Sequence, residues 1–122
     1  MTAIDEKEEA LQRLCEHWGG GFVVGHGMDT EILRKAGIEE ADAVVVATNG
    51  DNTNIVVGQV AQKRFGIECT VVRILDPARA ELYATLGLRT VCPTSNAIEV
   101  LSEAVKSCAV RPVLAPAPAA AS

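Results

Sequence analysis

Polar side chains that could bind a small molecule follow an apolar stretch near the middle of the chain. Residues 43–47 are small or branched apolar residues, and the polar segment Thr48-Asn49-Gly50-Asp51-Asn52-Thr53-Asn54 comes directly after them. An apolar run bounded by turn residues is typical of a strand buried on both faces of a parallel sheet. Ligands bind at the carboxyl ends of such strands. We therefore expect residues 47–54 to form one wall of a nucleotide site.

Three other polar positions follow apolar stretches. Asp5 ends the first stretch, residues 25–27 (Gly25-His26-Gly27) follow the second, and Arg73 lies at the end of a later one. A carboxylate can hold ribose hydroxyls, closely spaced glycines let backbone N–H groups approach phosphate, and a guanidinium can bind phosphate. The plainer interpretations are a solvated helix cap for Asp5, a turn for the G-x-G fragment and a solvent-directed side chain for Arg73.

The sequence contains no pattern that predicts catalysis or metal binding. It has no nucleophile elbow, Walker A motif or C-x-x-C pair, and its four cysteines are widely spaced: Cys15, Cys69, Cys92 and Cys108. We expect Cys69 and Cys92 to serve as small apolar core residues in strands. Asp29 and Asp76 have adequate roles as helix N-caps. The sequence therefore predicts no enzymatic activity and no metal site.

Strand-like and helix-like segments alternate along the chain. The apolar periodicity predicts strands near 1–5, 22–25, 43–47, 69–74 and 89–92, and helices near 6–17, 30–36, 53–65, 77–86 and 95–108. Gly19 to Gly21, Gly37, Gly66 and Gly87 are the expected helix ends, and Thr94 or Ser95 is the expected cap of the last helix. Gly58 inside the third helix costs about 1 kcal/mol relative to alanine unless it permits a close backbone approach. Short connections favour right-handed crossovers, a parallel sheet and a doubly wound α/β fold.

Length and composition limit the possible function. The chain has 122 residues, a net charge of −5 and 3% aromatic residues, which fit one aliphatic core and disfavour nucleic acid as a partner. No signal peptide or membrane-spanning run is recognisable, so we expect a cytosolic protein without direct membrane insertion. We expect one domain over residues 1–110 and a disordered Pro/Ala-rich tail over 111–122.

Several motifs, in this order and spacing, resemble the TrkA-N (RCK/KTN) nucleotide-binding domain of potassium-uptake regulators. The resemblance covers about residues 3–108, and its most specific part is Ala36-Gly37-Ile38-x-x-Ala41-Asp42-Ala43. The other matching segments are Ile4-Asp5, Gly25-x-Gly27-x-Asp29, Ala47-Thr48, Asp51-Asn52-x-Asn54, Arg73-x-x-Asp76-Pro77, Ala80-Glu81-Leu82, Leu86-Gly87 and Val91-x-Pro93.

The resemblance implies a Rossmann-like cytosolic domain that binds NAD(H) or adenine nucleotides such as ATP and ADP. Domains of this family assemble as dimers or rings on the inner face of a potassium channel or transporter and gate it. By this resemblance, Asp5 holds the adenosine ribose, and His26, between Gly25 and Gly27, lies near the base, where the family usually has an aspartate. Ala47, Thr48 and Asn49 line the nucleotide, and Arg73 faces its phosphates.

This sequence departs from the family at its start. The family's first strand and its G-x-G-x-x-G turn have no counterpart here, so we expect an N-terminally incomplete sheet in which strand 43–47 lacks one neighbour. Either the recorded start is too late, or a partner supplies the element, or the protein no longer binds nucleotide. The C-terminal regulatory subdomain that often follows in the family is also absent.

Three functions remain open at this point. The first is a cytosolic regulatory subunit, homo-oligomeric and nucleotide-binding, that controls the membrane subunit of a potassium channel or transporter. The alternative is a non-binding dimerisation module with a vestigial nucleotide site, in which helix 95–108 pairs with its copy through a stripe formed by Ile98, Leu101, Val105 and Cys108. A Rossmann dehydrogenase is weaker, because no proton donor can be named.

Overall fold

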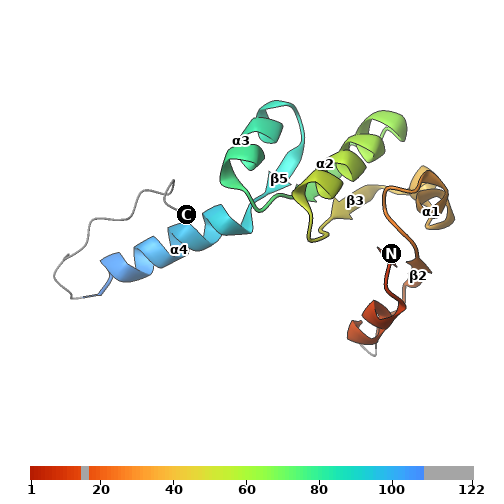
Figure 1. The fold of residues 1–122 in the computed structure, drawn as a ribbon, viewed down its shortest axis with the longest axis horizontal. Coiled ribbons are helices and arrows are strands. Elements are labelled where there is room, and N and C mark those ends of the chain that lie inside the picture. Colours follow the sequence, from red (N-terminus) through yellow and green to blue (C-terminus); the bar gives the residue numbers. More distant parts are fainter. Residues whose placement is uncertain (15–16, 109–122) are drawn as a thin grey trace.

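The computed structural model describes residues 1–14 and 17–108 and shows strands alternating with helices (Figure 1). The strands are β1 (Thr2–Asp5), β2 (Gly21–Val24), β3 (Ala43–Val46), β4 (Cys69–Arg73) and β5 (Arg89–Val91). The helices are η1 (Glu8–Arg13), α1 (Thr30–Lys35), η2 (Ile38–Glu40), α2 (Asp51–Gln59), η3 (Val60–Arg64), α3 (Pro77–Thr85) and α4 (Pro93–Lys106). The predicted α/β class is confirmed. The predicted tail, residues 111–122, and Cys15 lie outside the described residues.

The strands form two separate parallel sheets. A two-stranded sheet pairs β1 with β2, and a three-stranded sheet has the order β3-β4-β5. Every pairing is parallel: Ile4 lies opposite Val23, Val44 opposite Thr70, and Val72 opposite Thr90. Among the described residues, β1 pairs only with β2 and β3 only with β4. The expectation that strand 43–47 has only one neighbouring strand is therefore confirmed.

Capping residues set the bounds of two helices as predicted. The Asp29 side chain accepts a hydrogen bond from the Glu31 N–H at the start of α1, and the Asp76 side chain accepts one from the Ala78 N–H at the start of α3. Gly37, Gly66 and Gly87 have positive φ values of 91°, 67° and 100°, which only glycine adopts without strain. These residues therefore end the helical segments before them.

Three predicted helices differ from the structure. Over 6–17, only a 3₁₀ helix (η1) forms among the described residues, and acidic side chains on exposed positions give it little apolar surface to bury. Helix α2 begins at Asp51 rather than 53 and ends in a π-helical turn, η3. The N-cap of α4 is Cys92, not Thr94 or Ser95, because Pro93 occupies the first helical position instead of ending the segment.

Two apolar clusters form the core. The larger one lies between α2, α3 and the three-stranded sheet and consists of Val46, Ile55, Val57, Val72, Ile74, Ala80 and Leu88. The second lies under α1 and η3, consists of Leu33, Ile38, Ala61 and Ile67, and is contacted by both Ile4 of β1 and Val44 of β3. Helices and their flanking turns, rather than strand pairing, therefore join the two sheets.

Gly58 allows α2 to lie close to β4. A Cβ at this position would lie 2.4 Å from Cγ2 of Val72. The expected close approach is present, but the approaching group is the Val72 side chain rather than a backbone. Helix α2 therefore packs on the sheet face that carries Val46, Thr70 and Val72.

The prediction that strand 43–47 is buried on both faces is wrong. Burial alternates along β3: Val46 is buried, Val44 is partly buried, and Val45 is 72% exposed. The reason is that α2 covers only one face of the strand, and no described segment covers the other. Cys69 and Cys92 are half-buried rather than deep core residues.

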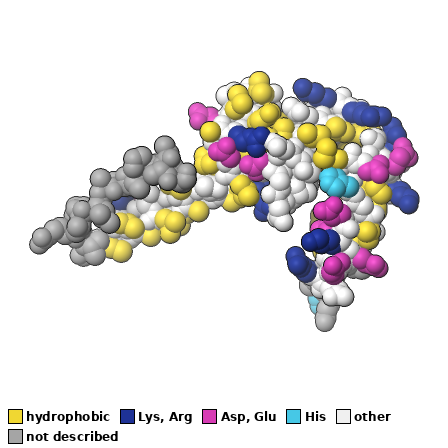
Figure 2. Space-filling view, in the orientation of Figure 1, with side chains coloured by type: hydrophobic (Ala, Val, Ile, Leu, Met, Phe, Trp, Pro, Cys, Tyr) yellow, Lys and Arg dark blue, Asp and Glu magenta, His cyan; other side chains and the backbone are white. Residues whose placement is uncertain are grey.

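Helix α4 extends away from the two sheets (Figure 1). None of its residues is buried, and hydrophobic side chains run along it (Figure 2). The large exposed hydrophobic residues of this helix are Ile98, Val100, Leu101 and Val105. Three members of the predicted apolar stripe, Ile98, Leu101 and Val105, therefore lie on a helix that no other described element covers. The fourth, Cys108, lies beyond the end of this helix at Lys106.

Candidate functional site

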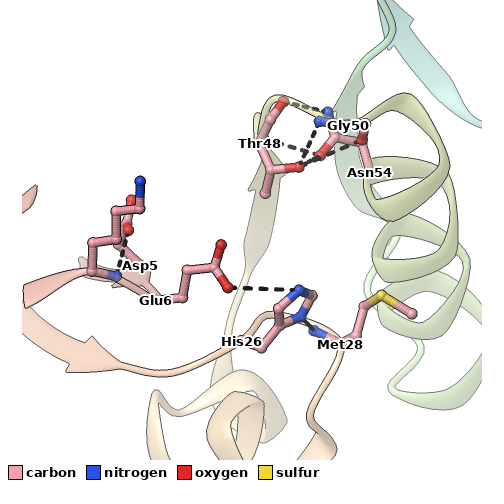
Figure 3. A network of polar contacts seen from close by, with 8 residues as sticks. Asp5, Glu6, His26, Met28, Thr48, Gly50 and Asn54 are labelled. Atoms are coloured by element: carbon pink, nitrogen blue, oxygen red, sulfur yellow. Dashed lines mark hydrogen bonds and ion pairs between the residues drawn. The ribbon is translucent and has the colours of Figure 1, made fainter.

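The polar loop after β3 is organised by one buried amide. The Asn54 side chain has 0% exposure. Its Oδ1 accepts hydrogen bonds from the Thr48 N–H at 2.9 Å and the Thr48 hydroxyl at 2.5 Å, and its Nδ2 donates to the Thr48 carbonyl at 3.0 Å. Figure 3 shows Thr48, Gly50 and Asn54 closing this turn. The β3–α2 loop, residues 47–50, therefore has a defined conformation in the structure.

The same amide connects this loop to the neighbouring strand. Nδ2 of Asn54 also donates to the Arg73 carbonyl at 2.8 Å, and Arg73 Nη2 donates to the Thr48 carbonyl at 2.7 Å. The Arg73 Nε atom is buried and has no partner among the described residues. The predicted site residues Thr48 and Arg73 are thus brought into direct contact, and one guanidinium donor of Arg73 has no acceptor within residues 1–14 and 17–108.

Asp51 connects the loop to the segment after β4. Its two carboxylate oxygens accept hydrogen bonds from the consecutive N–H groups of Leu75 and Asp76, at 2.8 and 3.0 Å. The next residue, Asn52, accepts a hydrogen bond from Arg79 of α3. The start of α2 is therefore tied to the β4–α3 loop, residues 74–76.

Asp5 ends β1, and His26 follows the end of β2. Each side chain accepts a hydrogen bond from the backbone N–H two positions further along the chain. Asp5 Oδ1 accepts from the Lys7 N–H at 2.8 Å, and His26 Nδ1 accepts from the Met28 N–H at 3.1 Å. His26 Nε2 lies 4.0 Å from Glu6 Oε2, and both of these side chains are largely exposed. Figure 3 shows these residues and the Thr48 turn coming from three different strand ends.

The two glycines around His26 have different surroundings. A Cβ at Gly25 would lie 2.5 Å from Cδ1 of Ile32, so Gly25 permits α1 to pack against the end of β2. A Cβ at Gly27 would meet only Cγ2 of Val57, at 3.8 Å. Steric room is therefore required at Gly25 for packing, whereas the backbone at Gly27 lies in more open space.

Ala47 and Asn49 lie in the same turn as Thr48, with exposed side chains. All polar atoms of Thr48 bond within the molecule, to Asn54, Arg73 or Gly50. Asp51 and Asn54 lie within the predicted wall of residues 47–54 and in the quoted Asp51-Asn52-x-Asn54 segment, but their individual roles were not predicted. Their spacing places both in the first turn of α2, which was the available signal.

Groups suited to a metal are not found together. The part of the chain that the structure describes contains no cluster of three or more His, Cys, Asp or Glu side chains that could hold a metal ion. Cys92 Sγ lies 3.7 Å from the Leu75 carbonyl and accepts from the Ser95 N–H at 3.4 Å, as an N-cap of α4. The position of Cys92 is therefore explained by helix capping.

Residues 1–94 match the family described as the TrkA-N domain. The chain belongs to this family. A Streptomyces coelicolor protein named "Trk system potassium uptake protein TrkA" is 45% identical over 91 residues, which cover 75% of this chain and 41% of that protein. The Vibrio alginolyticus protein of the same name is 34% identical over 77 residues, covering 63% of this chain and 17% of that protein. The chain thus spans less than half the length of these relatives.

Solved structures support the same fold. The "Kef CTD in AMP bound form" of Shewanella denitrificans has a TM-score of 0.69 at 20% identity, covering 86% of this chain and 64% of that one. The NAD(P)-binding domain of an exopolyphosphatase-related protein from Archaeoglobus fulgidus has a TM-score of 0.62 at 19% identity, covering 88% and 80%. The predicted TrkA-N membership and Rossmann-like α/β fold are confirmed. No helix within residues 1–14 and 17–108 is long and apolar enough to cross a membrane.

Proposed function

We propose that this TrkA-N chain binds an adenine nucleotide or NAD(H) and thereby regulates a potassium-uptake system. The observation that supports this most directly is the hydrogen bond from Arg73 to the Thr48 carbonyl, which joins the ends of β3 and β4. In open parallel α/β sheets, small molecules bind at this edge. The regulated partner would be the membrane subunit of a potassium channel or transporter, contacted from the cytoplasmic side.

The residues present fit an adenine nucleotide in two respects. Arg73 Nε is a buried donor that lacks an acceptor among the described residues, and a buried unpaired donor costs about 1–3 kcal/mol. An anionic phosphate oxygen would supply that acceptor. Asp5 keeps an exposed carboxylate at the end of β1, suited to ribose hydroxyls. Ala47 and Asn49 would line the nucleotide, with Gly25, His26 and Gly27 near the base.

In this proposal, the chain acts by binding rather than by catalysis. A nucleotide can shift a conformational equilibrium only by as much as its affinity differs between the two states. Regulation therefore requires that the nucleotide favour one arrangement of a homo-oligomer, and that this arrangement act on the membrane partner. The names of the relatives, which are potassium uptake proteins, support this assignment.

The direct test is titration calorimetry of the chain with NADH, NAD, ATP and ADP. We expect at least one of them to bind, and an Asp5→Ala variant to bind it more weakly. Asp42→Ala should bind it normally, because Asp42 is exposed and lies at the amino end of β3, opposite the edge with the predicted site. If none of the four nucleotides binds, the proposed function is wrong.

A second candidate function is a dimerisation module that binds no nucleotide. The observation that favours it is α4, on which Ile98, Leu101 and Val105 remain exposed on a helix without buried residues. Exposed apolar stripes of this kind mark protein–protein contacts. Size-exclusion chromatography with light scattering should then show a dimer that Leu101→Glu converts to a monomer. A monomeric wild-type chain would exclude this candidate.

A further inference from the structure

We propose that Asn54 and Asp51 are positioning residues of the nucleotide site: they hold the β3–α2 and β4–α3 loops in one fixed arrangement. This inference rests on the proposed function, because it concerns the loops that would contact the nucleotide. Neither side chain is assigned to contact the nucleotide itself. Their effect would pass through Thr48 and Arg73.

The chemistry of Asn54 matches its surroundings closely. An amide has one oxygen with two lone pairs and one nitrogen with two N–H groups. Both lone pairs and both N–H groups are used, by three groups of Thr48 and the Arg73 carbonyl. Because the side chain is fully buried, water cannot replace a lost partner. Aspartate has the same size but no N–H groups, so one of its acceptor oxygens would face the carbonyl oxygens of Thr48 and Arg73.

Asp51 holds the β4–α3 loop in a similar way. Each of its oxygens accepts one of two consecutive backbone N–H groups, those of Leu75 and Asp76. Hydrogen bonds to a charged acceptor are stronger than neutral ones. Asparagine at this position would keep one acceptor and direct an NH₂ group toward the second N–H. The segment 74–76 would then lose its fixed distance from the start of α2.

Together, these two residues join loops that are far apart in sequence. Thr48 and Arg73 are 25 positions apart, and so are Asp51 and Asp76. Both linking side chains stand in the first turn of α2, which the Gly58–Val72 contact holds against the sheet. A ligand that contacts both loops would meet them already arranged, which lowers the entropic cost of binding.

The test compares two isosteric substitutions with matched controls in the same chain. Asn54→Asp is paired with Asn96→Asp, because Asn96 is exposed and stands on α4, outside the predicted wall of residues 47–54. Asp51→Asn is paired with Asp42→Asn, an exposed aspartate without a side-chain hydrogen bond to a described residue. Calorimetry with NADH, NAD, ATP and ADP is performed well below each melting temperature.

We expect Asn54→Asp and Asp51→Asn to raise the dissociation constant by about tenfold to a hundredfold, and the controls to leave it unchanged. Hydrogen exchange followed by NMR should become faster at the amides of Thr48, Leu75 and Asp76, while the Val72 amide in β4 stays protected. Faster exchange at Val72 as well would indicate a general loss of structure and contradict a positioning role.

The outcomes separate this inference from the proposed function. If the wild-type chain binds none of the four nucleotides, both are wrong. If it binds and the two variants bind as tightly as their controls, only the positioning inference is wrong. Should Asn54→Asp fail to fold, the result with Asp51→Asn decides, because Asp51 is only partly buried and its loss leaves the core intact.

Discussion

The two sheets of this molecule are stabilised in different ways. In the three-stranded sheet, burial alternates strictly along β4, and buried Val72 and Ile74 pack against α2 and α3. In the two-stranded sheet, no residue of β1 or β2 is fully buried. The polar residues differ in the same way: Asn54, Asp51 and Arg73 make bonds across 19 to 25 positions, whereas Asp5 and His26 bond to N–H groups two positions away.

This difference shows which half of the candidate site is preformed. Hydrogen bonds between groups 19 to 25 positions apart can persist only while the tertiary structure is intact, so they fix the loops after β3 and β4. Local bonds at exposed positions form in many conformations and fix little. Of the predicted site residues, Thr48 and Arg73 therefore stand on a rigid support, and Asp5 and His26 stand on a weaker one.

The largest expected effect is a difference in stability loss between a substitution in the core of the three-stranded sheet and one in β1. Ile74→Ala removes a side chain with 0% exposure and should lower the free energy of unfolding by about 2–5 kcal/mol. Ile4→Ala in β1 removes a half-buried side chain and should cost less than about 2 kcal/mol, since the loss scales with the buried area. Urea denaturation followed by circular dichroism measures both. Equal losses would contradict the comparison.

A second pair of substitutions tests the packing of α2. Gly58→Ala places a methyl group 2.4 Å from Val72 Cγ2 and should destabilise the fold by about 1–3 kcal/mol through overpacking. Gly27→Ala, where the nearest atom outside the local chain is 3.8 Å away, is the control and should change stability little. Thermal melts should show the difference, and the double variant Gly58→Ala/Val72→Ala should melt higher than Gly58→Ala alone.

The smallest expected effect concerns the exposed pair of Glu6 and His26. Their atoms lie 4.0 Å apart, and the side chains are 63% and 49% exposed. Glu6→Gln should therefore change the free energy of unfolding by less than about 1 kcal/mol, because solvent screens exposed ion pairs. A larger loss in urea denaturation would show that the β1–β2 edge is more tightly organised than its geometry indicates.

Much of the architecture is predictable from the sequence because its signals are local. Asp29, Asp76 and Pro77 mark helix starts through side-chain chemistry and a fixed φ, and Gly37 and Gly87 mark helix ends through positive φ. The polar loop follows its strand as expected, although it ends at Gly50 because α2 begins at Asp51. Local signals failed over 6–17, because a helix there needs a surface to pack against. They also failed at Cys92, because the proline that follows it can either end a segment or begin a helix.

The candidate site was predictable only in part. The roles of Ala47, Thr48, Asn49, Arg73, Asp5, Gly25, His26 and Gly27 in nucleotide binding remain predictions. The buried position of Asn54 was not predictable, because a polar residue in the first turn of a helix is usually exposed or a cap. Its burial depends on the Arg73 carbonyl, which is 19 positions away in the sequence.

By itself, the sequence determined the α/β alternation, the caps of α1 and α3, and membership of the TrkA-N family, since each depends on residue types at short and regular spacing. Only the tertiary structure decided that Val45 is exposed and that Asn54 and Asp51 join the two loops. The physical reason is that burial and long-range hydrogen bonds depend on which segments pack together, and residue spacing along the chain does not specify that.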